Sequence, residues 1–134
     1  MNEELINNVR TSFGRCTISN SFFDDFYRDF LTSDPCIAPM FRSTDMVTQK
    51  QLLKNGISFL IMFANNSEFA KSKIQDLAES HAHTRLNIKP EMYKYWLGSL
   101  LRTIDRHDKQ STPALLEDWK MILSAGIKQM IKGY

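Results

Sequence analysis

The 134-residue sequence lacks the features of membrane, secreted and nucleic-acid-binding proteins. No apolar stretch approaches the roughly 20 residues that a membrane-spanning helix needs, and the acidic, polar start "MNEELINNVR" is unlike a secretory signal peptide. Lysine and arginine form no run of five or more, and the net charge is only +2. We therefore expect a cytoplasmic protein with no membrane partner and no nucleic-acid partner.

Cysteine is scarce as well. Cys16 and Cys36 are the only two, and the sequence contains no CxxC pair. Two thiols in a chain without an export signal are expected to stay reduced. They could not complete a four-ligand metal site without help from histidine.

Alternating apolar and polar runs with glycine-rich hairpin turns are also missing, so the sequence gives no reason to expect a β-sheet. Apolar residues instead recur at helical spacing almost throughout. Hydrophobic residues make up 43% of the chain and charged residues 24%, which is ordinary for a soluble globular protein. We predict an all-α single domain over residues 1–134, with six or seven helices. The expected apolar helix faces span residues 5–16, 22–31, 46–63, 74–81, 93–104 and 115–131.

Two of the three histidines, His81 and His83, lie two positions apart. On an α-helix two positions correspond to about 200° of rotation, so at most one of the two can face the core. Counted from Ile74, the helical spacing of the apolar residues places His81 on the apolar face. His83 is then expected on the polar side of the helix or in the loop beyond.

A histidine on an apolar face has two interpretations. It is either a neutral core residue with a hydrogen bond to backbone, which is the usual case, or an iron ligand through Nε2. In the second case its Nδ1–H would be held by the carbonyl of Leu77, one turn earlier. One histidine cannot build a zinc site, but it can bind haem iron, because the porphyrin supplies four ligands. Nine phenylalanines in an all-α chain suit the dry aromatic slot that a porphyrin needs.

Five stretches, in the same order and at similar intervals, resemble the haem domain of the flavohaemoglobins, and the whole chain is similar to a bacterial single-domain globin. No one stretch is specific by itself. The resemblance implies a globin fold of six to eight helices in a three-over-three arrangement around one haem b (iron protoporphyrin IX). The stretches are "FFDDFYRDFLTSDP" with the later "PMF", "TDMVTQKQLL", "IQDLAESH", "LNIKPEMYKYWLGSLL" and "EDWKMIL".

The resemblance also implies roles for particular residues. His81 would be the proximal iron ligand, and Tyr27 and Gln49 would be the distal gas-binding residues. Counting back from "NIKPE" makes His83 the ligand instead, but the helical phase favours His81. His83 and Arg85 are candidates for contacts with the haem propionates, although plain solvated side chains are commoner at such positions. The residues expected to line the haem pocket are Phe41, Met46, Leu53, Leu77, Tyr93, Trp96 and Leu97.

Tyr27 and Gln49 have structural interpretations too. Tyr27 lies on a phenylalanine-rich face, where its hydroxyl would be buried and would need a partner. A core tyrosine bonded to a helix carbonyl and a boundary glutamine reaching solvent would explain both residues without a ligand. Gln49 is expected on the apolar side of its helix. Its expected neighbours there are Met46, Leu52 and Leu53.

The function implied is reversible binding of dioxygen, and of nitric oxide and carbon monoxide, at a histidine-ligated iron. A nitric oxide dioxygenase activity would require a separate reductase, because flavohaemoglobins carry flavin and nicotinamide domains after the globin and this chain ends at Tyr134. In that family a Tyr and a Glu flank the proximal histidine. Tyr93 matches the Tyr, but counting from Trp119 places Tyr134 where the Glu would be. We therefore expect a weaker electronic push on the iron.

Two other functions fit the same residues. A gas or redox sensor would use the same pocket and would signal through a separate partner protein. A plain helical interaction module would keep the histidine, the tyrosine and the glutamine as core residues and would bind no haem. The sequence leaves carrier, detoxifier and sensor open, because all three use one pocket.

Overall fold

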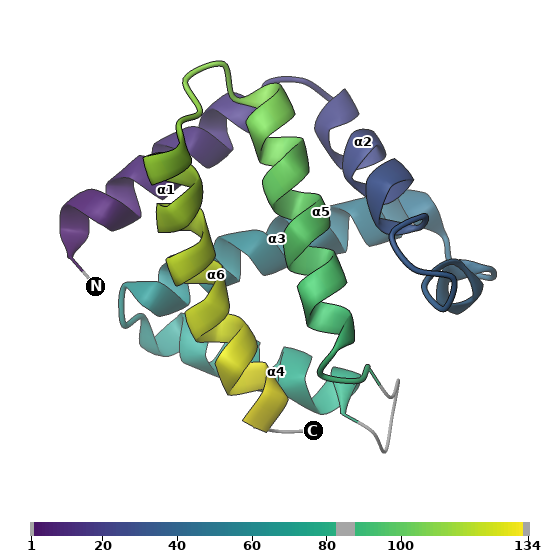
Figure 1. Cartoon of the computed structure of the whole chain (residues 1–134). Helices are drawn as coiled ribbons and strands as arrows, with labels where there is room; N and C mark the ends of the chain where they lie inside the picture. The colour runs from purple at the N-terminus through teal and green to yellow at the C-terminus, as the bar shows by residue number, and fades with distance from the viewer. Residues whose placement is uncertain (1, 83–87, 133–134) are drawn as a thin grey trace.

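The computed structural model describes residues 2–82 and 88–132. Every regular element in that part of the chain is a helix, and no strand is present there. The expected all-α class is therefore confirmed, and the six α-helices agree with the expected number (Figure 1). The elements are α1 (Glu3–Cys16), α2 (Ser21–Phe30), the 3₁₀ helix η1 (Ala38–Phe41), α3 (Met46–Ala64), α4 (Glu68–His81), α5 (Met92–His107) and α6 (Pro113–Lys132).

Several helices begin where the sequence offers a capping side chain. Asp45 accepts a hydrogen bond from the N–H of Val47 and so begins α3. Thr112 accepts one from the N–H of Leu115 at the start of α6. Pro113 is the first residue of α6, a position at which the missing N–H of proline has no helical partner to lose.

Helix α3 lies at the centre of the fold. It contacts α1, α2, α4 and α6, and Figure 1 shows it crossing behind α5 and α6. Its contact with α6 is close at Gly126, where an added Cβ would lie 2.1 Å from Cδ2 of Leu60. Leu60 is itself buried. A side chain at position 126 would therefore require Leu60 to move.

One cluster of buried side chains joins all six helices. On α3 the buried face differs from the expected one at Leu52, whose side chain is 56% exposed. The buried positions begin at Leu53 and recur with helical spacing, and Leu52 lies about 100° away from Leu53 around the helix. The prediction that Leu52 faces the core is therefore wrong. The largest fully buried side chains are Trp119, Phe22, Phe26, Ile6, Ile37, Ile57, Ile74, Leu100, Ile104, Ile122 and Leu123.

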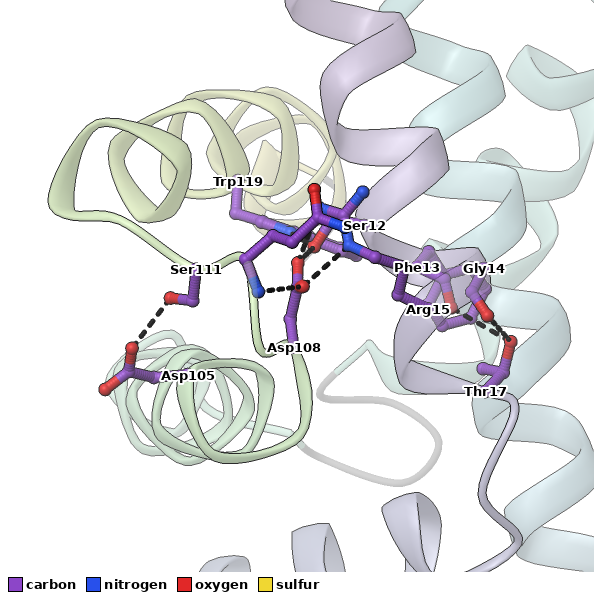
Figure 2. Close-up of polar contacts among 10 residues, drawn as sticks. Ser12, Phe13, Gly14, Arg15, Thr17, Asp105, Asp108, Ser111 and Trp119 are labelled. Atoms are coloured by element: carbon purple, nitrogen blue, oxygen red, sulfur yellow. Dashed lines mark hydrogen bonds and ion pairs between the residues drawn. The ribbon is translucent and has the colours of Figure 1, made fainter.

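A buried polar network ties α1, the end of α5 and α6 together (Figure 2). Asp108 is only 1% exposed. Its carboxylate accepts hydrogen bonds from Ser12 Oγ at 2.6 Å and from Arg15 Nε and Nη2 at 2.7 and 2.9 Å. Ser12 in turn accepts one from Trp119 Nε1 at 2.9 Å, and the N–H of Gln110 bonds to Asp108 at 3.0 Å. Every oxygen of this buried carboxylate is thus satisfied, as burial requires.

The same contacts set the ionisation of Asp108. Burial by itself raises the pKa of the carboxyl, but the hydrogen bonds from Arg15 and Ser12 outweigh it, so the pKa lies below its usual value. A carboxyl whose pKa is lower in the folded state stabilises the fold above its unfolded pKa, about 4. That contribution is lost as the pH falls through the folded pKa.

We predict that Asp108→Asn lowers the free energy of unfolding at pH 7 by about 2–4 kcal/mol, because it leaves Arg15 and Ser12 without their charged partner. The stability of the variant should also depend less on pH below about pH 4. Urea unfolding over a pH series measures both effects. Asp76→Asn, at an exposed position on α4, is the control and should change little. Equal loss of stability in the two variants would contradict the prediction.

Candidate functional site

His81 is the last residue of α4 and is half-buried. Its Nδ1 lies 2.7 Å from the carbonyl oxygen of Leu77 and 3.0 Å from Oγ of Ser80. A carbonyl oxygen can only accept a hydrogen bond, so Nδ1 must carry the ring proton. Burial lowers the pKa of His81, and the bond to Leu77 opposes this only in part. The ring is therefore neutral at pH 7, with its lone pair on Nε2.

The state of Nε2 distinguishes the two interpretations of His81. The bond from Nδ1 to backbone is expected in both. A core histidine would also be enclosed, whereas His81 is half-buried and Nε2 bonds to no residue within 2–82 and 88–132. A neutral ring with a free Nε2, held in orientation by a carbonyl, is the arrangement that a metal ligand needs. The residues present at this position therefore fit an axial ligand of haem.

The helical phase of α4 agrees with the sequence argument. Ile74 and Ala78 are buried on the face that His81 continues. The N–H of Ile88 bonds to the carbonyl oxygen of His81 at 2.9 Å, which brings the chain back to the end of α4. The candidates for propionate contacts, His83 and Arg85, lie outside the described residues.

Tyr27 and Gln49 are brought together from α2 and α3. Nε2 of Gln49 donates a hydrogen bond to Oη of Tyr27 at 3.0 Å. Tyr27 is only 4% exposed. Burial raises the pKa of Tyr27 to about 12, although the bond from Gln49 lowers it somewhat. The hydroxyl therefore keeps its proton, and its partner is a side chain rather than a helix carbonyl.

The Tyr27–Gln49 pair retains a free donor whichever way the amide is turned. With Gln49 donating, the hydroxyl proton of Tyr27 is available to a third group. With the amide reversed, Tyr27 would donate to the amide oxygen and the NH₂ group of Gln49 would be available. Two polar side chains in a buried setting thus present at least one hydrogen-bond donor to a ligand.

The seven side chains expected around a haem come from η1, α3, α4 and α5. Leu53 is buried, but the other six are only half-buried although they are large and apolar. Large apolar side chains left partly open on these four elements fit surfaces that an apolar ligand covers. The six half-buried residues are Phe41, Met46, Leu77, Tyr93, Trp96 and Leu97.

Phe41 and Tyr93 lie on different sides of this set. The ring of Phe41 packs against Tyr27 with 5.9 Å between centroids. Tyr93 lines an open cavity of about 260 Å³ between α5 and α6, together with Leu97 and Ile127. Burial raises the pKa of Tyr93 to about 12, and no hydrogen bond joins it to His81 among the described residues. Tyr134, which stands where the family has a Glu, is outside those residues.

Two features are absent from residues 2–82 and 88–132. Within them, no helix is long and apolar enough to cross a membrane. The same residues contain no group of three or more His, Cys, Asp or Glu side chains that could hold a metal ion.

The sequence reasoning missed the contacts that hold α2 in place. Asp25 and Asp29 lie one turn apart on α2, and both bond to side chains of α5. Their spacing along one helix face was a visible signal, but nothing in the sequence indicated which helix they would meet. These contacts matter because α2 also carries Tyr27.

Comparison with known proteins gives one informative likeness. No family model matches the chain, and no curated protein matches it. A crystal structure of a protein from Pseudomonas aeruginosa PAO1 superposes on the fold with a TM-score of 0.93 and 39% sequence identity. The likeness covers 97% of this chain and 98% of that chain, and that protein is described as structurally highly homologous to a human hemoglobin.

The free Nε2 of His81 generates a direct prediction. The purified protein should take up one haem per chain, and His81→Ala should abolish or greatly weaken the bond between iron and protein. His83→Ala should leave the absorption spectrum nearly unchanged. Spectra of the ferric and ferrous forms measure this, and haem should also raise the melting temperature of the wild type, because it binds the folded state. The opposite behaviour of the two variants would mean that His83 is the ligand.

Proposed function

Because this chain belongs to the globin family, we propose that it is a haem b protein that reversibly binds dioxygen and other diatomic gases, with His81 as the proximal ligand. The observation that carries this proposal is the state of His81. Its ring is neutral and oriented by the carbonyl of Leu77, and its Nε2 bonds to no other residue in the described part of the chain. Haem bound there would supply a ferrous iron with one position open to a gas.

The residues around that position would act by orientation and by hydrogen bonding. The carbonyl of Leu77 keeps the proton on Nδ1 and so keeps the lone pair of His81 on Nε2. On the distal side, Tyr27 and Gln49 would donate to the gas. Their donors lie in a buried setting, where a hydrogen bond is stronger than in water. Phe41, against Tyr27, would help to exclude water from the pocket.

This arrangement would favour dioxygen over carbon monoxide. Dioxygen takes up more negative charge in such a pocket, and a hydrogen bond to a charged acceptor is roughly twice as strong as one to a neutral acceptor. A bond of this kind contributes about 1.5–3 kcal/mol, which corresponds to about a ten- to hundredfold slower dissociation. Tyr27 and Gln49 would therefore strengthen the binding of dioxygen more than that of carbon monoxide.

We predict that Tyr27→Phe, which keeps the ring and removes the hydroxyl, speeds dioxygen dissociation by about tenfold and changes carbon monoxide dissociation much less. Gln49→Leu should act in the same direction and more weakly. Stopped-flow and flash-photolysis kinetics measure both gases. Tyr95→Phe, the same chemical change at a residue of α5 outside the expected pocket, is the matched control. Equal effects on the two gases would show that Tyr27 only shapes the pocket.

We also propose nitric oxide detoxification as an activity of the same site. Nitric oxide and dioxygen combine with one electron to give nitrate, and the donors of Tyr27 and Gln49 would hold the dioxygen for that reaction. Each further cycle needs a new electron. We propose that a separate reductase supplies that electron to this helical domain, whose described helices share one core.

We predict that protein loaded with ferrous haem, which would provide the first electron, gives one turnover to nitrate without additions and sustained turnover only with an added flavin reductase. Nitrate formation followed by stopped flow, with and without the reductase, tests this. A gas or redox sensor that acts through a partner protein is the alternative. It would be favoured if reduction stayed slow beside every reductase tried and if gas binding changed the affinity for a partner, a coupling of about 1–3 kcal/mol.

A further inference from the structure

Two opposite faces of helix α2 make polar contacts with different helices. Asp25 and Asp29 are four positions apart and so share one face, whereas Tyr27 lies about 200° of rotation from each of them. The two carboxylates bond to α5, and the hydroxyl of Tyr27 bonds to Gln49 of α3. Figure 1 shows α2 beside α5, with α3 passing behind. The helix that carries the distal tyrosine is thus held from its opposite side.

The contact at Asp29 fixes the orientation of its carboxylate as well as its distance from α5. Arg102 donates from Nε and Nη2 to the two oxygens of Asp29, at 3.0 and 2.7 Å. Oγ of Ser99, which is fully buried, donates to Oδ1 at 2.7 Å. A forked guanidinium and a buried hydroxyl allow one orientation of the carboxylate. The bond from Arg102 holds the pKa of Asp29 below its usual value, so the carboxylate is charged at neutral pH.

The contact at Asp25 repeats this one turn earlier. Nε2 of His107 lies 2.6 Å from Oδ2 of Asp25, and both side chains are mostly buried. Arg28 donates to the other oxygen at 2.8 Å. The ring of His107 also packs edge-on against Phe22, with 5.4 Å between centroids. Two contacts one turn apart, both away from the axis of α2, together resist rotation and tilting of this helix.

A small rotation of α2 about its axis would displace the hydroxyl of Tyr27. The hydroxyl of a tyrosine stands roughly 9 Å from the axis of its helix, so a turn of about 10° moves it by about 1.5 Å. A displacement of about 1 Å can cost a hundredfold in the effect of a positioned group. The fixed rotation of α2 is therefore a condition for Tyr27 to reach its ligand.

We propose that Asp25 and Asp29 are positioning residues, which hold α2 against His107, Ser99 and Arg102 of α5 and thereby aim the hydroxyl of Tyr27. The inference rests on the proposed gas-binding role of Tyr27. Asp24 adds a third contact from the side of α3, where its carboxylate pairs with Lys50 at 2.5 Å, next to Gln49. That pair is substantially exposed and adds less.

The test compares Asp29→Asn and Arg102→Gln in the haem-loaded protein. Asp29→Asn should speed dioxygen dissociation by about three- to tenfold and change carbon monoxide dissociation by less than about twofold. Arg102 is 57% exposed at its side chain, so Arg102→Gln should fold even if the first variant does not, and it should act in the same direction. The infrared stretch of bound carbon monoxide should move toward its value in Tyr27→Phe in both variants.

Two controls distinguish an effect on the orientation of the Tyr27 hydroxyl from an effect on the stability of the fold. Ile122→Val shortens a fully buried side chain of α6, which packs against α1, α3, α4 and α5, and should lower the melting temperature without moving the infrared band. In a Tyr27→Phe background, Asp29→Asn should have almost no further effect on dioxygen, because no hydroxyl remains to be aimed.

The outcomes are distinguishable. If Tyr27→Phe itself leaves dioxygen dissociation unchanged, the proposed role of Tyr27 fails and the inference fails with it. If Tyr27→Phe acts but Asp29→Asn behaves like Ile122→Val, or acts equally with and without the hydroxyl, the contacts are structural only. In that case the positioning role alone is overturned.

Discussion

The close approach of α3 and α6 is the constraint on which the rest of the structure depends. Leu60 of α3 fills the space beside Gly126 of α6, and a Cβ at position 126 would lie 2.1 Å from its Cδ2, so a side chain there would force Leu60 to move. With α3 seated against α6, the same helix also reaches α1, α2 and α4. It can then present Gln49 to Tyr27 at one end and lie beside the helix of His81 at the other. Helix α3 thus carries Gln49 itself and packs against the two helices that carry Tyr27 and His81.

In the candidate site, hydrogen bonds fix the positions of protons and leave groups that can bind a ligand. The proton of His81 is fixed on Nδ1 by the carbonyl of Leu77, and Nε2 bonds to no other described residue. Tyr27 and Gln49 satisfy one another, and one donor is left over. Both groups are uncharged at neutral pH, since burial lowers the pKa of the histidine and raises that of the tyrosine. A neutral base on one element and a neutral donor on two others suit a globin that binds uncharged gases.

The charged pairs on α2 are proposed to orient that helix as well as to stabilise the fold. Exposed ion pairs contribute about 0–1 kcal/mol, yet the carboxylates of α2 bond to partners that are forked or mostly buried. Such contacts select one rotation of a short helix whose apolar face would tolerate several. The network at Asp108 stabilises the junction where α1 meets α5 and α6. Polar contacts thus specify geometry that hydrophobic burial leaves open.

The sequence by itself determined the helices and the inward phase of His81, because both follow from the spacing of apolar residues within one segment. It also determined the bond from His81 to Leu77, which spans a single helical turn. Only the tertiary structure decided that Leu52 would face outward. It also decided that Asp29 would meet Ser99, 70 positions away, and that Asp25 would meet His107, 82 positions away. Helical periodicity places a side chain on a face, but the partner of that face depends on how separate helices pack.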